Sequence, residues 1–222
     1  MIDGVRIKIC GLTSLVDAEF SDRCGVDYLG FNLFPGSPRH ISLAQFRAMA
    51  PRLPERRRVA VMVAPSRDEL AAAVDAGFDY FQIHFASDTA VEIVGGWSER
   101  VGAKRLWLAP KLPPDAELAT AWLPLAKFFL LDAFDKEKFG GTGRTSDWEK
   151  FARCQREHAD HFWILSGGLN PENIGAALQA TGAKFVDVNS GVERAPGVKD
   201  EAKLKAFIVA LHHAALARTK LS

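Results

Sequence analysis

Four side chains capable of chemistry stand close to the ends of short apolar runs. Cys10 follows VRIKI, His84 ends YFQIH and Asp132 ends FFLLD. Arg39 lies in FPGSPRH, shortly after the apolar run DYLGFNL. A thiol is reactive as its thiolate, carboxyl and imidazole groups can move protons, and a guanidinium can hold a carboxylate with two parallel hydrogen bonds. These residues are therefore our candidates for catalysis and substrate binding.

Three glycine-rich segments give a second chemical signal. They are GGTGR at residues 140–144, SGGLN at 166–170 and NSGVE at 189–193. Glycines let backbone N–H groups approach an anion closely, and barrels of alternating strands and helices often bind phosphate at their last two loops. We therefore expect a phosphate site, for which the candidates are Gly141, Gly143, Gly167, Gly168, Asn189, Ser190 and Gly191.

These groups must be positioned by a repeating pattern of short apolar runs and helical segments. Eight runs rich in Val, Ile and Phe predict buried parallel strands at residues 5–9, 27–33, 58–63, 79–83, 105–108, 127–131, 162–165 and 184–188. Eight such units suit closure, so we predict an α/β fold with residues 1–222 in one (βα)8 TIM barrel. A doubly wound open sheet is the structural alternative. In a barrel the candidate residues would meet at the carboxyl ends of the strands.

Helix signals fall between these runs. Ser66 with Glu69 forms a capping box, and Asn170 precedes a proline suited to a first helical turn. Further starts are predicted at Thr13, Ser42, Ser87 and Ser146, with Gly25 and Gly77 ending two helices. Residues 199–217 predict the last helix, and a helix at 115–122 has the weakest pattern.

Alternation along the strands predicts which side chains enter the barrel. Lys8 shares a face with Cys10, and Asp187 shares one with Asn189. The first and last strands become neighbours when a barrel closes, and a buried charge needs a partner. We therefore expect Lys8 and Asp187 to form an ion pair, either as a structural pair alone or one in which Lys8 also favours the Cys10 thiolate.

Composition excludes several classes of protein. A net charge of +1 over 222 residues argues against nucleic acid as the main partner, and no apolar run is long enough to span a membrane. The three cysteines have neither disulfide nor metal-site spacing, so we expect free thiols in a cytoplasmic protein. The six histidines show no paired ligand spacing, and no GxGxxG opens a first strand–helix turn, so neither a metal nor a dinucleotide is expected.

Together the motifs resemble the phosphoribosylanthranilate isomerase family of tryptophan biosynthesis. The matching segments are KICGLT, GFNLFPGSPRHIS, QIH, LLD…GGTGRTSDW, LSGGLNPENI and DVNSGVE…PGVKD, from residue 8 to about residue 200. The resemblance implies an isomerase without a cofactor that converts N-(5-phosphoribosyl)anthranilate into 1-(2-carboxyphenylamino)-1-deoxyribulose 5-phosphate. That rearrangement needs an acid and a base. The expected partner is this phosphorylated small molecule, and we expect a monomer or a homodimer.

The resemblance also implies roles for individual residues. Cys10 matches the general base, Asp132 the general acid and Arg39 the residue that holds the anthranilate carboxylate. Gly167, Gly168, Ser190 and Gly191 match the phosphate-binding backbone, and His84 matches a position near the substrate.

The sequence departs from the family pattern at VAVMVA, QIHF and LWLAPKLPP. Trp107 and Phe85 in these segments could form a modified aromatic wall for the substrate, or could simply be core. The related histidine-pathway isomerase is the nearest alternative enzyme. That enzyme is associated with aspartates as both acid and base, so the cysteine at position 10 disfavours it. A non-catalytic phosphate-binding scaffold is the alternative from another class.

Overall fold

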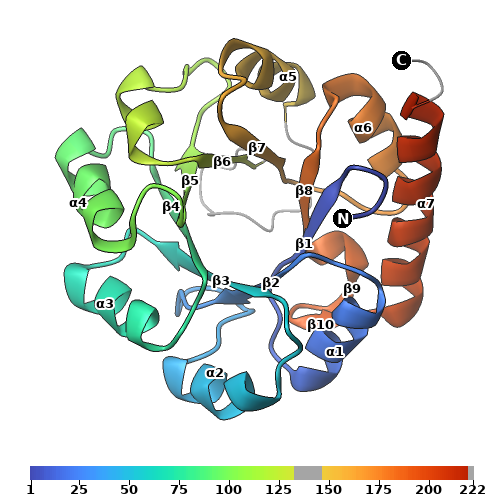
Figure 1. The fold of residues 1–222 in the computed structure, drawn as a ribbon, viewed down its shortest axis with the longest axis horizontal. Helices are drawn as coiled ribbons and strands as arrows, with labels where there is room; N and C mark the ends of the chain where they lie inside the picture. Colours follow the sequence, from blue (N-terminus) through green and yellow to red (C-terminus); the bar gives the residue numbers. More distant parts are fainter. Residues whose placement is uncertain (133–146, 220–222) are drawn as a thin grey trace.

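The computed structural model describes residues 1–132 and 147–219. Eight parallel strands close into a barrel in the order of the chain, with the helices around it (Figure 1). The strands are β1 (Arg6–Ile9), β2 (Tyr28–Asn32), β3 (Arg57–Val63), β4 (Tyr80–Ala86), β5 (Leu106–Lys111), β6 (Phe128–Leu131), β7 (Phe162–Leu165) and β8 (Phe185–Val188). The predicted closed α/β barrel is confirmed, and β4 and β5 run further than predicted.

The outer layer consists of helices that follow the strands. They are α1 (Leu15–Arg23), α2 (Leu43–Met49), α3 (Arg67–Asp75), α4 (Val91–Val101), α5 (Trp148–Glu157), α6 (Ile174–Thr181) and α7 (Glu201–Thr219). Short 3₁₀ helices occupy Ala50–Arg52 (η1), Thr120–Leu125 (η2) and Ser190–Val192 (η3). The strands β9 (Glu193–Ala195) and β10 (Val198–Lys199) form a hairpin after β8. The capping boxes at Ser42 and Ser66 satisfy the free N–H groups of α2 and α3.

Some predicted helix starts are wrong. Ser14 caps α1, because the hydroxyl of Thr13 instead donates to the carbonyl of Gly197 at 2.6 Å. The helix α4 begins after Ala90 rather than at Ser87. The predicted start at Ser146 lies outside the described residues, and the first described residue after it, Asp147, caps α5.

Three other helix boundaries also differ. The predicted helix at 115–122 is replaced by η2, which contains Pro124, a residue that cannot donate an N–H within an α-helix. Lys199 belongs to β10, so the last helix starts later than predicted, at Glu201. The side chain of Asn170 accepts hydrogen bonds from Glu172 and Asn173, so it caps a turn that precedes α6.

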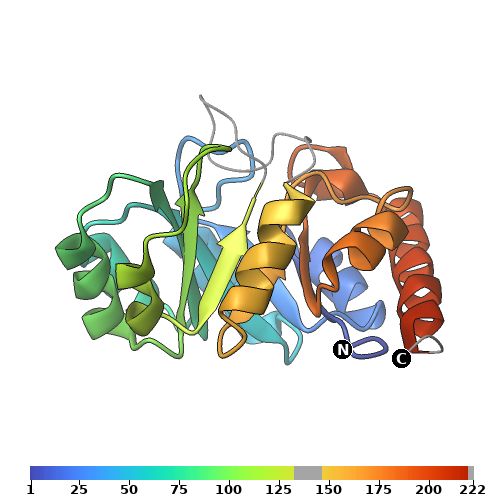
Figure 2. The same ribbon diagram turned by 90° about the horizontal axis from the view of Figure 1, so that it is seen from above.

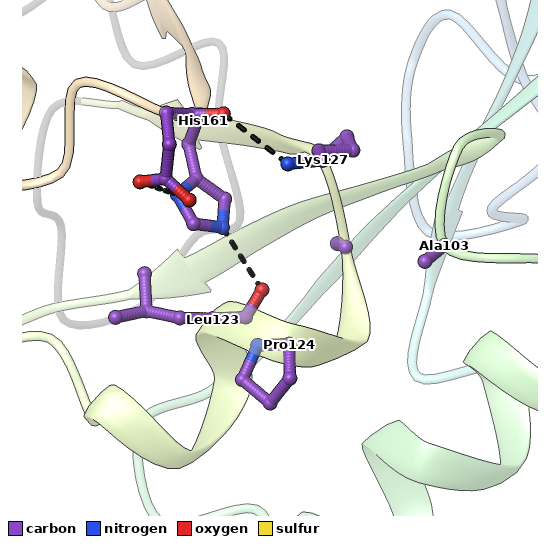
Figure 3. A pocket seen from close by; sticks show the side chains of 7 residues that line it. Ala103, Leu123, Pro124, Lys127 and His161 are labelled. Atoms are coloured by element: carbon purple, nitrogen blue, oxygen red, sulfur yellow. Dashed lines mark hydrogen bonds and ion pairs between the residues drawn. The ribbon is translucent and has the colours of Figure 1, made fainter.

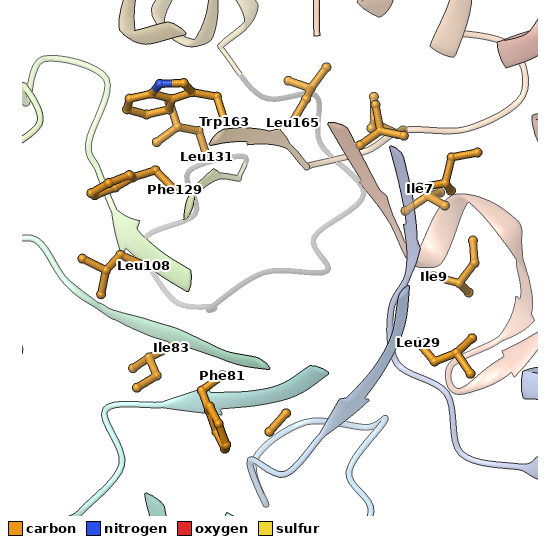
Figure 4. Packing of buried hydrophobic residues seen from close by; sticks show 14 of the residues in the cluster. Ile7, Ile9, Leu29, Phe81, Ile83, Leu108, Phe129, Leu131, Trp163 and Leu165 are labelled. Carbon is orange, nitrogen blue, oxygen red and sulfur yellow. The ribbon is translucent and has the colours of Figure 1, made fainter. Parts of the chain in front are cut away.

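Apolar side chains pack in two separate places. Those on the outer face of the strands, such as Ile9, Phe129 and Leu165, are buried against the helices (Figure 4). A second set fills the inside of the barrel, and we call it the inner aromatic cluster, namely Tyr28, Tyr80, Trp107, Phe128 and Phe185 with small aliphatic neighbours. Their rings lie 5.0 to 5.8 Å apart in mostly edge-to-face contacts.

This packing settles the two aromatic residues suggested as a substrate wall. Trp107 is fully buried inside the barrel, and Phe85 is fully buried on the outer face against Trp97 and Trp122, with centroid distances of 5.5 and 5.1 Å. Both therefore belong to the core.

The two ends of the barrel differ in what they carry. The first residues of the chain and the end of α7 lie at the amino end of the strands, and the segments that follow β2 and β8 lie at the opposite end (Figure 2). Within residues 1–132 and 147–219, every helix is too short or too polar to cross a lipid bilayer.

Candidate active site

Cys10 stands directly after β1, at the carboxyl end of the barrel. Its backbone N–H donates to the carbonyl of Val188 at 2.9 Å, which ties it to the end of β8. The next residue, Gly11, has a φ of 70° and no room for a side chain, because a Cβ there would lie 2.6 Å from Cδ of Arg39 and 2.8 Å from Oδ1 of Asn189. The structure therefore brings Cys10, Arg39 and Asn189 together, as the strand-end argument predicts.

The ion pair expected below Cys10 is present. Nζ of Lys8 donates to Oδ2 of Asp187 at 2.8 Å, and the register of β1 and β8 places the two residues opposite each other. Both side chains are almost completely buried. Although burial alone would lower the pKa of Lys8, attraction to Asp187 and to Cys10 raises it above its ordinary value. Gly30 makes room for this lysine, since a Cβ there would lie 2.7 Å from Lys8 Cε.

The surroundings of Cys10 act on its acidity in opposite directions. Burial and then the negative charge of Asp187 raise the pKa of the thiol, while Lys8 and Lys199 act to lower it. The net effect is a pKa above the ordinary value of a thiol. Lys8 acts in favour of the thiolate, but its effect on the pKa is smaller than that of burial, and a role of Lys8 in activating Cys10 stays a prediction.

His84 lies on the inner face of β4 and is also buried. Nε2 of Gln82 contacts Nε2 of His84 at 2.8 Å, so the amide donates and the imidazole proton resides on Nδ1. Burial, assisted by the charge of Lys8, lowers the pKa of His84 to about 3. The side chain is therefore neutral near pH 7 and offers an N–H donor rather than a charge.

Arg39 is held by residues that the sequence analysis did not assign. Its Nε donates to both carboxylate oxygens of Glu193, at 2.9 and 3.1 Å, and its Nη2 donates to Oε2 at 2.7 Å. Lys199 donates to Oε1 of Glu193 at 2.9 Å and to Oδ1 of Asn189 at 3.0 Å. The two additional residues, Glu193 and Lys199, come from the β9–β10 hairpin and lie within the segments NSGVE and PGVKD, but neither residue has a role in the sequence-based prediction.

Hydrogen bonds set the charges of this group. Although burial would raise the pKa of Glu193, its bonds to Arg39 and Lys199 lower it, so it is ionised. Burial lowers the pKa of Lys199, and the attraction of Glu193 opposes that effect. All three side chains are more than nine-tenths buried.

The last two loops present backbone N–H groups. Gly167 and Gly168 have φ values of 95° and 62°, a conformation that favours glycine. A Cβ on Gly191 would lie 1.9 Å from the carbonyl oxygen of Leu169, so the two loops touch at that point. Within the described residues, the N–H groups of Gly167, Gly168, Ser190 and Gly191 have no acceptor. They are available to an anion, whereas Gly141 and Gly143 lie outside the described residues.

Asp132 directly follows β6 and is partly buried. On the neighbouring strand, Lys111 shares the inner face with Trp107 and Ala109. The β5–β6 register, Trp107↔Phe128 and Leu108↔Phe129, brings Lys111 level with Asp132 when it is continued along both strands. The segment LWLAPKLPP departs from the family pattern, but its lysine is not among the predicted site residues, because β5 extends further than the apolar run at 105–108 indicates.

A metal site and a separate cavity are the other two kinds of site that a barrel of this kind could carry. Among the described residues no group of His, Cys, Asp and Glu side chains could hold a metal ion. A cavity of about 360 Å³ lies at the amino ends of β5, β6 and β7, lined by Ala103, Leu123, Pro124, Ala126, Lys127, Asp160 and His161 (Figure 3). Its polar groups bond to one another or to backbone carbonyls, and it lies at the end of the barrel opposite Cys10.

The fold is that of (βα)8-barrel enzymes, and one end of the barrel carries a thiol, a carboxyl group, a guanidinium and, within the described residues, backbone N–H groups without an acceptor. The family model described as N-(5'-phosphoribosyl)anthranilate (PRA) isomerase matches residues 7–210. The chain is 36% identical to N-(5'-phosphoribosyl)anthranilate isomerase of Aquifex aeolicus, over 92% of this chain and 97% of the relative. It belongs to the N-(5'-phosphoribosyl)anthranilate isomerase family.

Solved structures agree with this assignment. A phosphoribosyl anthranilate isomerase in complex with reduced 1-(o-carboxyphenylamino)-1-deoxyribulose 5-phosphate superposes with a TM-score of 0.75 at 32% identity, covering 94% of this chain and 99% of the other. A structure of monomers generated from the dimeric Thermotoga maritima enzyme has a TM-score of 0.73 at 32% identity, covering 93% and 98%.

Proposed function

We propose that this chain isomerises N-(5'-phosphoribosyl)anthranilate to 1-(2-carboxyphenylamino)-1-deoxyribulose 5-phosphate, a step of tryptophan biosynthesis, with Cys10 as base and Asp132 as acid. The observation that carries the proposal is the position of Cys10 at the barrel mouth, with the stem of Arg39 directly over the adjacent Gly11. A base and a carboxylate receptor side by side suit a substrate whose carboxylated ring is joined through nitrogen to C1, next to the carbon C2 that loses its proton.

The reaction requires two proton transfers on the sugar. Asp132 gives a proton to the ring oxygen as the C1–O bond breaks, which leaves an iminium between C1 and the anthranilate nitrogen. The Cys10 thiolate then removes the proton on C2. The electrons of that C–H bond form the C1=C2 bond of an enolamine, which tautomerises to the aminoketone.

The remaining groups hold the substrate in place. The N–H groups of Gly167, Gly168, Ser190 and Gly191, which have no acceptor among the described residues, suit the phosphate, and glycine lets the anion approach that backbone closely. Gly141 and Gly143 remain predicted phosphate-loop residues. His84 is neutral, so we assign it a hydrogen bond to the sugar rather than charge pairing. The three free cysteines of the chain suit a reducing compartment, in support of a cytoplasmic location.

Turnover of the wild type, Cys10→Ser and Asp132→Asn tests the two roles, followed as loss of the substrate's anthranilate fluorescence. We expect activity in the wild type and a loss of about 10²- to 10⁴-fold in each variant, the range for removing a general acid or base. Circular dichroism confirms that the variants are folded. Substantial activity in Cys10→Ser would refute the role of Cys10 as base, and an inactive wild type would refute the function.

A further inference from the structure

The arrangement around Arg39 leaves only part of its guanidinium free. A guanidinium has five N–H groups, one on Nε and two on each terminal nitrogen. Glu193 accepts from Nε and Nη2, and in the described part of the chain Nη1 donates to no acceptor. The free N–H groups are therefore those of the Nη1–Nη2 end, which can hold a carboxylate with two parallel bonds.

Charge within this group favours an anion. Arg39 and Lys199 are two cations that share the single carboxylate of Glu193. The three side chains therefore carry one formal positive charge in excess, in a place from which water is almost excluded. A buried charge without a partner is costly, and a bound carboxylate would supply that partner.

Rotation of Arg39 is also restricted. Its stem passes over Gly11, where even a Cβ would be too close, and its head is fixed at both Nε and Nη2. Glu193 is in turn held by Lys199 and by the backbone N–H of Gly197 at 3.2 Å. The orientation of Arg39 thus depends on a hairpin that follows β8, far from Arg39 in the sequence.

We propose that Glu193, supported by Lys199, is a positioning residue that presents the Nη1–Nη2 end of Arg39 to the anthranilate carboxylate, and so sets the preference for an ortho-carboxylated substrate. This inference rests on the proposed function. Glu193 touches no reacting atom and acts through Arg39 alone. Its removal will therefore weaken recognition of the carboxylate without a comparable effect on a substrate that lacks it.

The test compares kcat/KM for N-(5'-phosphoribosyl)anthranilate with that for N-(5'-phosphoribosyl)aniline, which lacks the carboxylate, with both products measured by chromatography. The ratio of the two values does not depend on the fraction of folded enzyme. We expect Glu193→Gln to lower this ratio by about 10- to 100-fold, as does the loss of a charge-assisted hydrogen bond. Glu201→Gln, the same change at an exposed carboxylate on α7, will leave it unchanged.

A second variant separates orientation from charge. Glu193→Gln with Lys199→Met removes one cation together with the carboxylate, so the excess charge stays the same. We expect the same fall in the ratio, because Arg39 is no longer fixed. An equal loss for both substrates, or an unchanged ratio in either variant, would overturn the positioning role. A wild type that converts neither substrate would instead overturn the proposed function.

Discussion

Cys10 and its two charged neighbours form a small electrostatic system inside the barrel. A thiol removed from water ionises less readily, and Asp187 opposes a second negative charge beside it. Lys8 opposes both effects on the thiol: it donates a hydrogen bond to Asp187, and its positive charge also attracts the thiolate. The base proposed here is therefore mostly protonated at neutral pH in the unbound enzyme, so kcat/KM will rise with pH as the thiolate forms.

Asp187→Asn tests this balance. The change removes the negative charge and leaves Lys8 free to pair with the thiolate, so we expect the pKa of Cys10 to fall. The rate of Cys10 alkylation as a function of pH, with the labelled peptide identified by mass spectrometry, measures that pKa. Asp75→Asn, the same change on the exposed end of α3, is the matched control. A pKa that is unchanged or higher in Asp187→Asn would contradict the account.

Some of these residues could be predicted from the sequence and others could not, for a physical reason. The Lys8–Asp187 pair could be predicted because strand alternation points both side chains into the barrel, and barrel closure makes their two strands neighbours. Glu193 could not be assigned, since its partner Arg39 is 154 positions away and the two meet only through a hairpin with no strong pattern of its own.

At the level of elements, the strands were more predictable than the helix starts. Buried parallel strands are continuous apolar runs, and all eight are visible in the sequence. Helix caps are less specific, because many Ser and Thr residues precede polar segments. Ser66 caps its helix, while the hydroxyl of Thr13 bonds instead to Gly197 in a distant loop, a choice that only the tertiary structure decides.

Contact between the loops after β7 and β8 provides a prediction at this scale. Gly191→Ala would place a methyl group against the carbonyl of Leu169, so the loops must separate. We expect a loss of about 1–3 kcal/mol in the free energy of unfolding, as for overpacking, and weaker inhibition by inorganic phosphate. Urea unfolding and phosphate inhibition measure the two effects.

Gly96→Ala is the matched control for that substitution. This glycine lies within α4, and nothing is within 4 Å of the added Cβ. We expect unchanged phosphate inhibition and a gain of about 0.5–1 kcal/mol from the greater helix propensity of alanine. Normal phosphate inhibition in Gly191→Ala would show that the contact does not shape the phosphate site.

The molecule as a whole will respond to acid through His84. Its pKa is about 3 in the folded protein and 6.5 ordinarily, so between these values the unfolded chain binds a proton that the folded chain does not. The stability from neutral His84 is therefore full above pH 6.5 and is lost as the pH falls towards 3. We expect His84→Gln to show a shallower loss over this window in urea unfolding at successive pH values. Parallel curves for the two proteins would refute the assignment.

Assembly is the remaining property of the whole molecule. The Thermotoga maritima relative is described as dimeric, and for this chain a monomer and a homodimer both remain predictions. Light scattering after size-exclusion chromatography decides between them.

The inner aromatic cluster also determines by which end of the barrel small molecules enter and leave. Tyr28, Trp107, Phe128 and their neighbours fill the inside of the barrel near the amino end of the strands. The barrel is therefore closed at that end and is not a channel. Substrate must enter, and product must leave, by the same opening, so the two can never occupy the passage independently. Product that lingers there will exclude the next substrate, which makes its departure a natural limit on the rate of the cycle.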